Sequence, residues 1–206
     1  MSTRAVIARA QNGSWIGRFH HWDGYPTGLG LAIQQNANGL FKGDLAGLMH
    51  LLIDEHPAGW DSIVDKDLSL PAGLQDMVPS HSLPCTICGE YGAAHLCQNI
   101  KDHPQPLPCG KNYAFHLGHE HQADPVEVEK LGRYPQCLCH GEGQGEAWAV
   151  TPENIGDSWC EWLYVVDVEA QTMAVRSSYD DWEKVLTVNL DRPSIAWAKK
   201  LERSFE

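Results

Sequence analysis

The sequence predicts an α+β fold, in which helices cover one face of an antiparallel sheet and a zinc-binding insertion interrupts the body. Three observations predict it: strand-like runs near both ends, two stretches of helical apolar periodicity, and a Cys- and His-rich stretch without such periodicity. We expect residues 1–84 and 146–206 to form the body and residues 85–145 to form the insertion. The 206 residues, 43% of them hydrophobic, suffice for one domain of this kind.

The N-terminal segment, residues 1–22, predicts a β-hairpin. Residues 3–10 partly alternate apolar and polar side chains, and residues 14–22 resume an apolar and aromatic run. Between them, the Gln-Asn-Gly sequence at residues 11–13 tolerates the positive φ angles that a tight turn needs. The two runs are therefore expected to pair as antiparallel strands.

Two helices are expected to follow the hairpin. Thr27 is placed to cap the first, LGLAIQQNA, and the Asn-Gly pair at 38–39 suits its C-terminal end. The second is expected to run from about Asp44, as its N-cap, to His56, because apolar residues fall three to four apart on one face. Residues 57–84, rich in Pro, Gly, Asp and Ser, are expected to be a connector.

The C-terminal segment, residues 146–206, predicts strands and a terminal helix. Residues 146–150 resemble a strand, and residues 160–178 predict a hairpin that turns near residues 169–171. Residues 182–190 predict a further strand, and a helix is expected to start in the segment Asp191–Ser194. The expected apolar side of this helix consists of Ile195, Ala198 and Leu201.

Acidic residues concentrate in the middle and at the end of the chain. Residues 1–40 carry three arginines and one acid, residues 41–84 carry seven acids and two lysines, and residues 147–206 carry eleven acids and six bases. The net charge of −12 disfavours contact with a phosphate backbone, so nucleic-acid binding is not expected. Two interpretations remain open: an acidic face that keeps the protein soluble, or a surface that imitates DNA to occupy a basic partner.

Most of the seven cysteines lie in close pairs, and these are expected to bind metal. No apolar run approaches the ~20 residues of a membrane helix, and the opening of the chain lacks the pattern of a secretory signal, so we expect a cytoplasmic protein. In a reducing compartment, paired cysteines among histidines ligate metal more often than they form disulfides.

The sequence CTICG predicts a zinc knuckle, in which Cys85 and Cys88 converge on one ion. A second closely spaced pair, Cys137 and Cys139, is the favoured completion, followed by Cys109. Four protein ligands would leave no open position for water, so we expect a structural zinc. Other candidate ligands are His95, Cys97, His116, His119, His121 and His140, whereas Cys160 is expected to be an ordinary buried thiol.

The segment HHWDGYP has two interpretations. In the first, His20 or His21 carries a proton or binds a ligand, Asp23 is its partner, and Trp22 and Tyr25 wall a pocket. In the second, the Asp-Gly pair and the proline make a turn that the aromatic residues fasten to the core. Each interpretation places this segment where the hairpin ends and the first helix begins.

The opening residues Met1–Arg4 (MSTR), together with His21–Pro26 (HWDGYP), resemble a family of small phage and prophage proteins without an assigned activity. The resemblance covers residues 1–40 and, less closely, residues 137–141 (CLCHG) and 160–167 (CEWLYVVD). It implies an origin in a phage or mobile element, and therefore a role in host takeover or counter-defence in the host cytoplasm.

The same N-terminus resembles the bile-salt hydrolase and penicillin acylase group of N-terminal nucleophile enzymes. That resemblance implies Ser2 as nucleophile, with Arg18 and Asp23 as further catalytic residues. A freed α-amine with a pKa near ~8 can act as base for its own side chain. The chain has serine where that group has cysteine, and it lacks the group's downstream motifs.

Three functions follow as hypotheses. The leading one is an acidic, zinc-containing protein that binds a host macromolecule, with a host protein as partner and no catalytic activity. The second is an amide hydrolase that uses Ser2, and the third is a protein that sequesters a small ligand in an HHWDGYP pocket.

Overall fold

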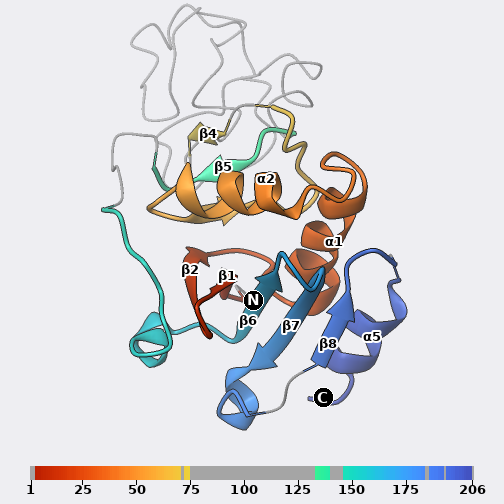
Figure 1. Ribbon diagram of the computed structural model, residues 1–206. Coiled ribbons are helices and arrows are strands. Elements are labelled where there is room, and N and C mark those ends of the chain that lie inside the picture. The colour runs from red at the N-terminus through yellow and green to blue at the C-terminus, as the bar shows by residue number, and fades with distance from the viewer. Residues whose placement is uncertain are drawn as a thin grey trace, which may run out of the picture. The chain divides into compact units, whose positions relative to one another are not determined.

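The chain divides into two compact units, residues 1–75 with 135–206, and residues 76–134. The first unit carries the fold described below (Figure 1). No helix in the described part of the chain is long and apolar enough to span a bilayer. The computed structural model describes residues 3–70, 72–74, 133–139, 146–183, 186–192 and 194–205.

The described strands form one eight-stranded sheet in the order β4-β5-β3-β2-β1-β6-β7-β8. The centre of the sheet consists of β2, β1 and β6, and the short strands β4 and β5 form one edge. The strands are β1 Ala5–Gln11, β2 Ser14–His20, β3 Trp60–Ser62, β4 Gly73–Leu74, β5 Gln136–Cys137, β6 Trp162–Asp167, β7 Thr172–Ser177 and β8 Leu186–Asn189.

The sheet is mixed, so the expectation of an antiparallel sheet is wrong. The predicted hairpins are present, since β1 pairs antiparallel with β2, and β6 pairs antiparallel with β7. The pair that joins the two halves, β1 with β6, is parallel and sets Ala5 opposite Trp162. The pairs β2 with β3 and β4 with β5 are parallel as well. Local patterns predict pairing across a short turn, whereas these pairs join segments distant in the chain.

Two helical regions follow the hairpin, as expected. Asp44 is confirmed as an N-cap, because its carboxylate accepts a hydrogen bond from the Gly47 N–H at 2.9 Å. Thr27 is not a cap: the helix begins one residue earlier at Pro26, a residue suited to a first helical turn. The helical elements are η1 Pro26–Gly30, α1 Leu31–Asn38, α2 Leu45–Met49, η2 His50–Asp54, η4 Ile155–Ser158, η5 Ser178–Asp180 and α5 Ala196–Glu202.

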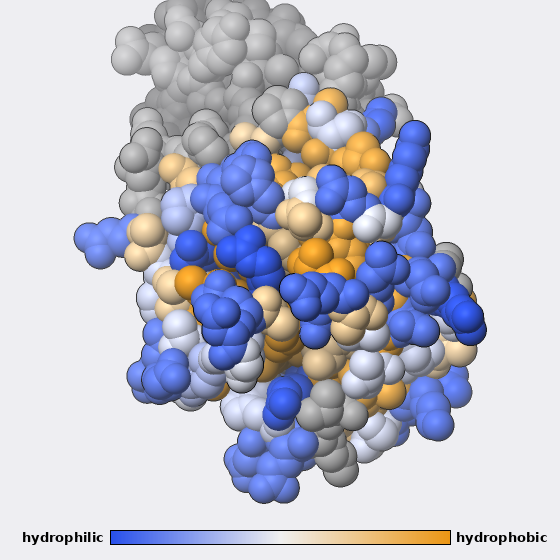
Figure 2. Space-filling view, viewed as in Figure 1, coloured by the Kyte–Doolittle hydropathy of each residue, from blue (hydrophilic) through white to orange (hydrophobic). Residues whose placement is uncertain are grey.

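The two faces of the sheet bury different partners. On one face, Ile7 and Tyr164 lie in the main core together with the apolar residues of α1, α2 and η2. On the other face, Val6 and Leu163 pack with Val150 in a smaller core. This division follows from the two-residue period of a strand, which sends successive side chains to opposite faces. Figure 2 shows hydrophilic residues over much of the viewed surface, with apolar residues between them.

The C-terminal half departs from prediction at three places. Residues 146–150 form no named strand, and their β pairing is the isolated bridge between Val150 and Gly17. Strand β8 runs from Leu186 to Asn189, and Trp182, where the strand was expected to start, adopts a positive φ of 66°, as Asp181 does at 54°. Helix α5 starts after Ile195, which is 54% exposed and does not face the core.

Candidate metal centre

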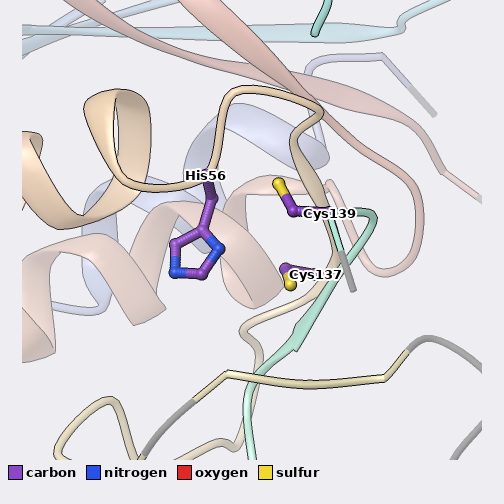
Figure 3. Close-up of side chains that lie close together, drawn as sticks. All are labelled: His56, Cys137 and Cys139. Atoms are coloured by element: carbon purple, nitrogen blue, oxygen red, sulfur yellow. The ribbon is translucent and has the colours of Figure 1, made fainter. Parts of the chain in front are cut away.

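Three potential metal ligands meet where η2 ends and β5 passes. The donor atoms of His56, Cys137 and Cys139 all lie within 4.8 Å of one another. His56 is 6% exposed, Cys137 is fully buried, and Cys139 is half-buried. Figure 3 shows the imidazole turned toward the two thiol side chains, which come from one short stretch of chain. The three side chains therefore form a compact N and S donor set.

The pairing of β5 brings the two cysteines to the same place. Cys137 ends β5 opposite Trp60, and the Leu138 N–H continues the pairing by donating to the Gly59 carbonyl at 3.0 Å. The chain bends at Leu138 and Cys139, and the Cys139 Sγ accepts a hydrogen bond from the Ala58 N–H at 3.3 Å, close to His56.

A tight turn after η2 positions His56. The Gly59 N–H donates to the His56 carbonyl at 2.9 Å, which closes the turn. Gly59 has a φ of +92°, and a Cβ at this position would lie 2.5 Å from the Phe19 carbonyl oxygen, so only glycine fits. The His56 ring packs against the Trp60 ring with a centroid distance of 4.3 Å. Trp60 is itself fixed, because its indole N–H donates to the Leu52 carbonyl at 2.8 Å.

The Cys139 sulfur lies near an amide N–H and a guanidinium group. The Ala58 N–H donates a hydrogen bond to the Cys139 Sγ at 3.3 Å. Hydrogen bonds from main-chain amides stabilise thiolate ligands of metal ions. The Arg18 guanidinium donates to the Ile53 carbonyl at 2.8 Å. Burial lowers the pKa of Arg18, while Asp54 and Cys139 raise it. The Arg18 guanidinium is therefore close enough to Cys139 for an electrostatic interaction.

The donor set fits a soft or borderline metal ion. Two thiolates and an imidazole are ligands that zinc prefers. In tetrahedral coordination with zinc–sulfur bonds of about 2.3 Å, two sulfurs lie about 3.8 Å apart. The donor spread of 4.8 Å therefore requires only a small closure around an ion. Three donors among the described residues fill three positions of such a site, and the fourth position takes water or another side chain.

The predicted ligands Cys137 and Cys139 come together, whereas Cys85, Cys88 and Cys109 lie outside the described residues. Sequence reasoning missed His56, because it was assigned to the last turn of an amphipathic helix. The sequence feature that could have indicated His56 as a ligand is its position directly before a Pro-Ala-Gly turn, because a helix ends there and a side chain can turn inward.

Cys160 is a buried thiol, as expected. It is 5% exposed, and burial raises its pKa to about 11. Its Sγ lies 3.6 Å from the Ser158 carbonyl oxygen. A thiol with so high a pKa stays protonated at neutral pH, which suits packing rather than metal binding.

The side chains of the HHWDGYP segment lie in different environments. His20 is fully buried, and its Nε2 accepts a hydrogen bond from the Ile63 N–H at 3.1 Å. His21 pairs with Asp61, with 3.1 Å between Nδ1 and Oδ1, and Trp22 is 44% exposed. Burial raises the pKa of Tyr25, and the Asp23 carboxylate raises it further.

The three residues named as catalytic candidates are not joined by any hydrogen bond in the described part of the chain. Ser2 lies outside that part. Arg18 is held by the Ile53 carbonyl, and Asp23, at a φ of 57°, accepts a hydrogen bond from the Leu29 N–H at 2.9 Å through its main-chain oxygen.

Comparison of the chain with protein-family models, with curated proteins and with solved structures gave no match. The function is therefore inferred from the geometry of the described residues. The feature with the most specific chemistry is the His56, Cys137 and Cys139 cluster.

Proposed function

We propose that this chain is a zinc-binding protein in which the ion is structural, and that it acts by binding a host protein rather than by catalysis. The observation that carries the proposal is the convergence of His56, Cys137 and Cys139. The phage-type resemblance of residues 1–40 supports the choice of a host protein as partner. The negative net charge, −12, supports a protein partner over nucleic acid.

A structural role is proposed because the ion would join β5 to the end of η2. Strand β5 has two residues, and a strand of that length makes too few main-chain hydrogen bonds to hold itself in place. It lies between β4 and β3 in the sheet, and both of these neighbours are short as well, so the pairing on either side of β5 is limited. An ion on His56 and on both cysteines would tie β5 to the end of η2. The metal would thereby supply the stability that short pairing does not.

The test is zinc content per chain for single variants, with matched controls. Substitutions His56→Ala, Cys137→Ser and Cys139→Ser should each lower bound zinc by one equivalent relative to wild type. The controls are His50→Ala, an exposed histidine at the start of η2, and Cys160→Ser, a buried cysteine outside the cluster. Both controls should keep the full zinc content.

Cobalt substitution adds a direct measure of the ligand set. Thiolate-to-cobalt charge-transfer absorption should be present in the wild type and in both controls, and it should fall in all three cluster variants, because each of them loses the ion. Full zinc content in all three cluster variants would overturn the proposal. Turnover of an amide substrate by the zinc-loaded protein, lost in the same variants, would show that the ion is catalytic instead.

A further inference from the structure

An open cleft lies on the side of the sheet that carries the smaller core. Its volume is about 460 Å³. One wall comes from the end of β2, and another comes from the segment that precedes β6. The lining residues are Arg4, Phe19, Trp148, Asp157, Ser158 and Trp159.

Trp159 in this cleft is exposed and held in an unfavourable backbone conformation. Its side chain is 81% exposed although it is a large apolar residue. It follows η4 with a φ of 57°, in the left-handed region that glycine and asparagine favour. No described hydrogen bond or ring contact involves its side chain. The backbone conformation and the exposed indole of Trp159 therefore both lower the stability of the fold, and no described interaction within the chain compensates for them. This combination indicates that Trp159 contacts another molecule.

A row of aromatic rings extends from the cleft along the end of β2. The Trp148 and Phe19 centroids are 6.2 Å apart, Phe19 and His21 are 6.0 Å apart, and His21 and Trp22 are 4.5 Å apart. Trp148 is 38% exposed and Trp22 is 44% exposed. The row suits an extended ligand better than a single compact one.

The charge beside the cleft is negative. Residues 146–161, which carry Trp148 and Trp159, contain four acids and no base. Three of these acids, Glu146, Glu153 and Asp157, are exposed, and Arg4 is the single base in the lining. Aromatic faces and carboxylates together attract ammonium and guanidinium groups. Phosphate-bearing ligands would be repelled, and a neutral sugar would gain hydrogen bonds from the acids but no charge attraction.

We propose that this cleft docks an extended peptide segment of a partner protein, with a lysine or arginine side chain on the Trp159 face. The inference rests on the proposed function, because it names the surface through which the protein binds its partner. The cation stacks on the indole and lies near the Asp157 carboxylate, and the rest of the segment follows the aromatic row. Binding weakens with added salt, since exposed charges contribute to it.

The test measures peptide binding by tryptophan fluorescence and by calorimetry. The probes are a short peptide of alternating proline and arginine, its lysine counterpart and its glutamate counterpart. Proline keeps all three extended, so that only the charge differs. The arginine and lysine peptides should bind, and the glutamate peptide should not.

Substitution Trp159→Gly should weaken binding of the arginine peptide about tenfold, the scale of one cation–π contact. Asp157→Asn should weaken it less and reduce its salt dependence. Ile195→Ala, which removes an exposed apolar side chain elsewhere, is the control and should bind as wild type.

Equal binding of the arginine and glutamate peptides, or unchanged binding in Trp159→Gly, would overturn the inference. Binding of a neutral oligosaccharide in place of the peptides would do the same. Zinc content is measured on the same samples. Absence of peptide binding in wild-type protein that contains its full zinc contradicts the cleft alone, and peptide binding by wild-type protein that contains no zinc contradicts the metal proposal alone.

Discussion

Substitution Gly59→Ala should destabilise the protein far more than the same change at Gly43. The two glycines have nearly equal φ angles, +92° and +91°. They differ in surroundings: a Cβ at Gly59 would lie 2.5 Å from the Phe19 carbonyl oxygen, whereas a Cβ at Gly43 would meet nothing within 4 Å. The pair therefore separates the cost of backbone conformation from the cost of collision.

The magnitudes follow from these two terms. An alanine at such a φ costs about 1–2 kcal/mol, offset by about 0.4–1 kcal/mol because alanine restricts the unfolded chain. Gly43→Ala should therefore lose about 1 kcal/mol in the free energy of unfolding. At Gly59 the collision is with backbone and cannot be relieved by a side-chain rotation, which adds about 1–3 kcal/mol. Gly59→Ala should lose about 2–4 kcal/mol.

Urea denaturation of the two variants and the wild type measures the difference. Because Gly59 closes the turn that positions His56, its variant should also bind zinc more weakly, and Gly43→Ala should bind it normally. Equal stability losses at the two positions would refute the reasoning about the turn. A large loss at Gly59 with unchanged zinc affinity would show that the turn does not position the ligand.

Two further variants and one treatment test other parts of the structure. Trp159→Gly should raise the free energy of unfolding by about 0.5–1 kcal/mol, because glycine favours its φ of 57°; a loss in thermal denaturation would show that the indole stabilises the fold. Burial lowers the pKa of His20 from 6.5 to about 3, so the unfolded chain binds more protons between these pH values and stability falls as pH falls from 6.5 toward 3. That pKa difference corresponds to up to about 5 kcal/mol of unfolding free energy at ~1.4 kcal/mol per pH unit. His20→Gln should flatten the slope of the unfolding free energy against pH over this range. An unchanged slope would show that other groups cause the pH dependence. Chelation of zinc should lower the melting temperature of the wild type, and it should leave that of Cys137→Ser unchanged; an equal decrease in both would place the stabilising ion elsewhere.

The sequence predicted the local elements well because their signals are local. The hairpin over residues 5–20 follows from alternation around an Asn-Gly turn, and the Asp44 cap follows from a short polar residue before an apolar stripe. The parallel pairing of β1 with β6 was not predictable in the same way. It depends on which buried strand of the second half packs best beside β1. This is decided by tertiary packing, which the residues next to β1 in the sequence do not determine.

The candidate metal centre was predictable in part. Cys137 and Cys139 were found because closely spaced cysteines are rare unless they ligate metal. His56 was not found, because a histidine at the end of an apolar helix has no spacing relation to cysteines that lie far along the chain. Only the pairing of β5 with β3 brings them together. His21 was likewise assigned to Asp23, whereas its carboxylate partner is Asp61, supplied by the neighbouring strand.

The candidate metal centre and the aromatic cleft are connected through one residue. Pro57 lies between His56 and Ala58, and its carbonyl accepts a hydrogen bond from the Trp148 N–H at 3.0 Å. An ion that fixes His56 would therefore also fix one wall of the cleft, whereas Trp159 is held by η4 instead. Zinc removal should weaken binding of the arginine peptide in the wild type and in Trp159→Gly, and it should weaken it much less in Trp148→Ala. Titrations with and without chelator measure this coupling. An equal effect of zinc removal in all three proteins would show that the ion acts on the cleft by another route.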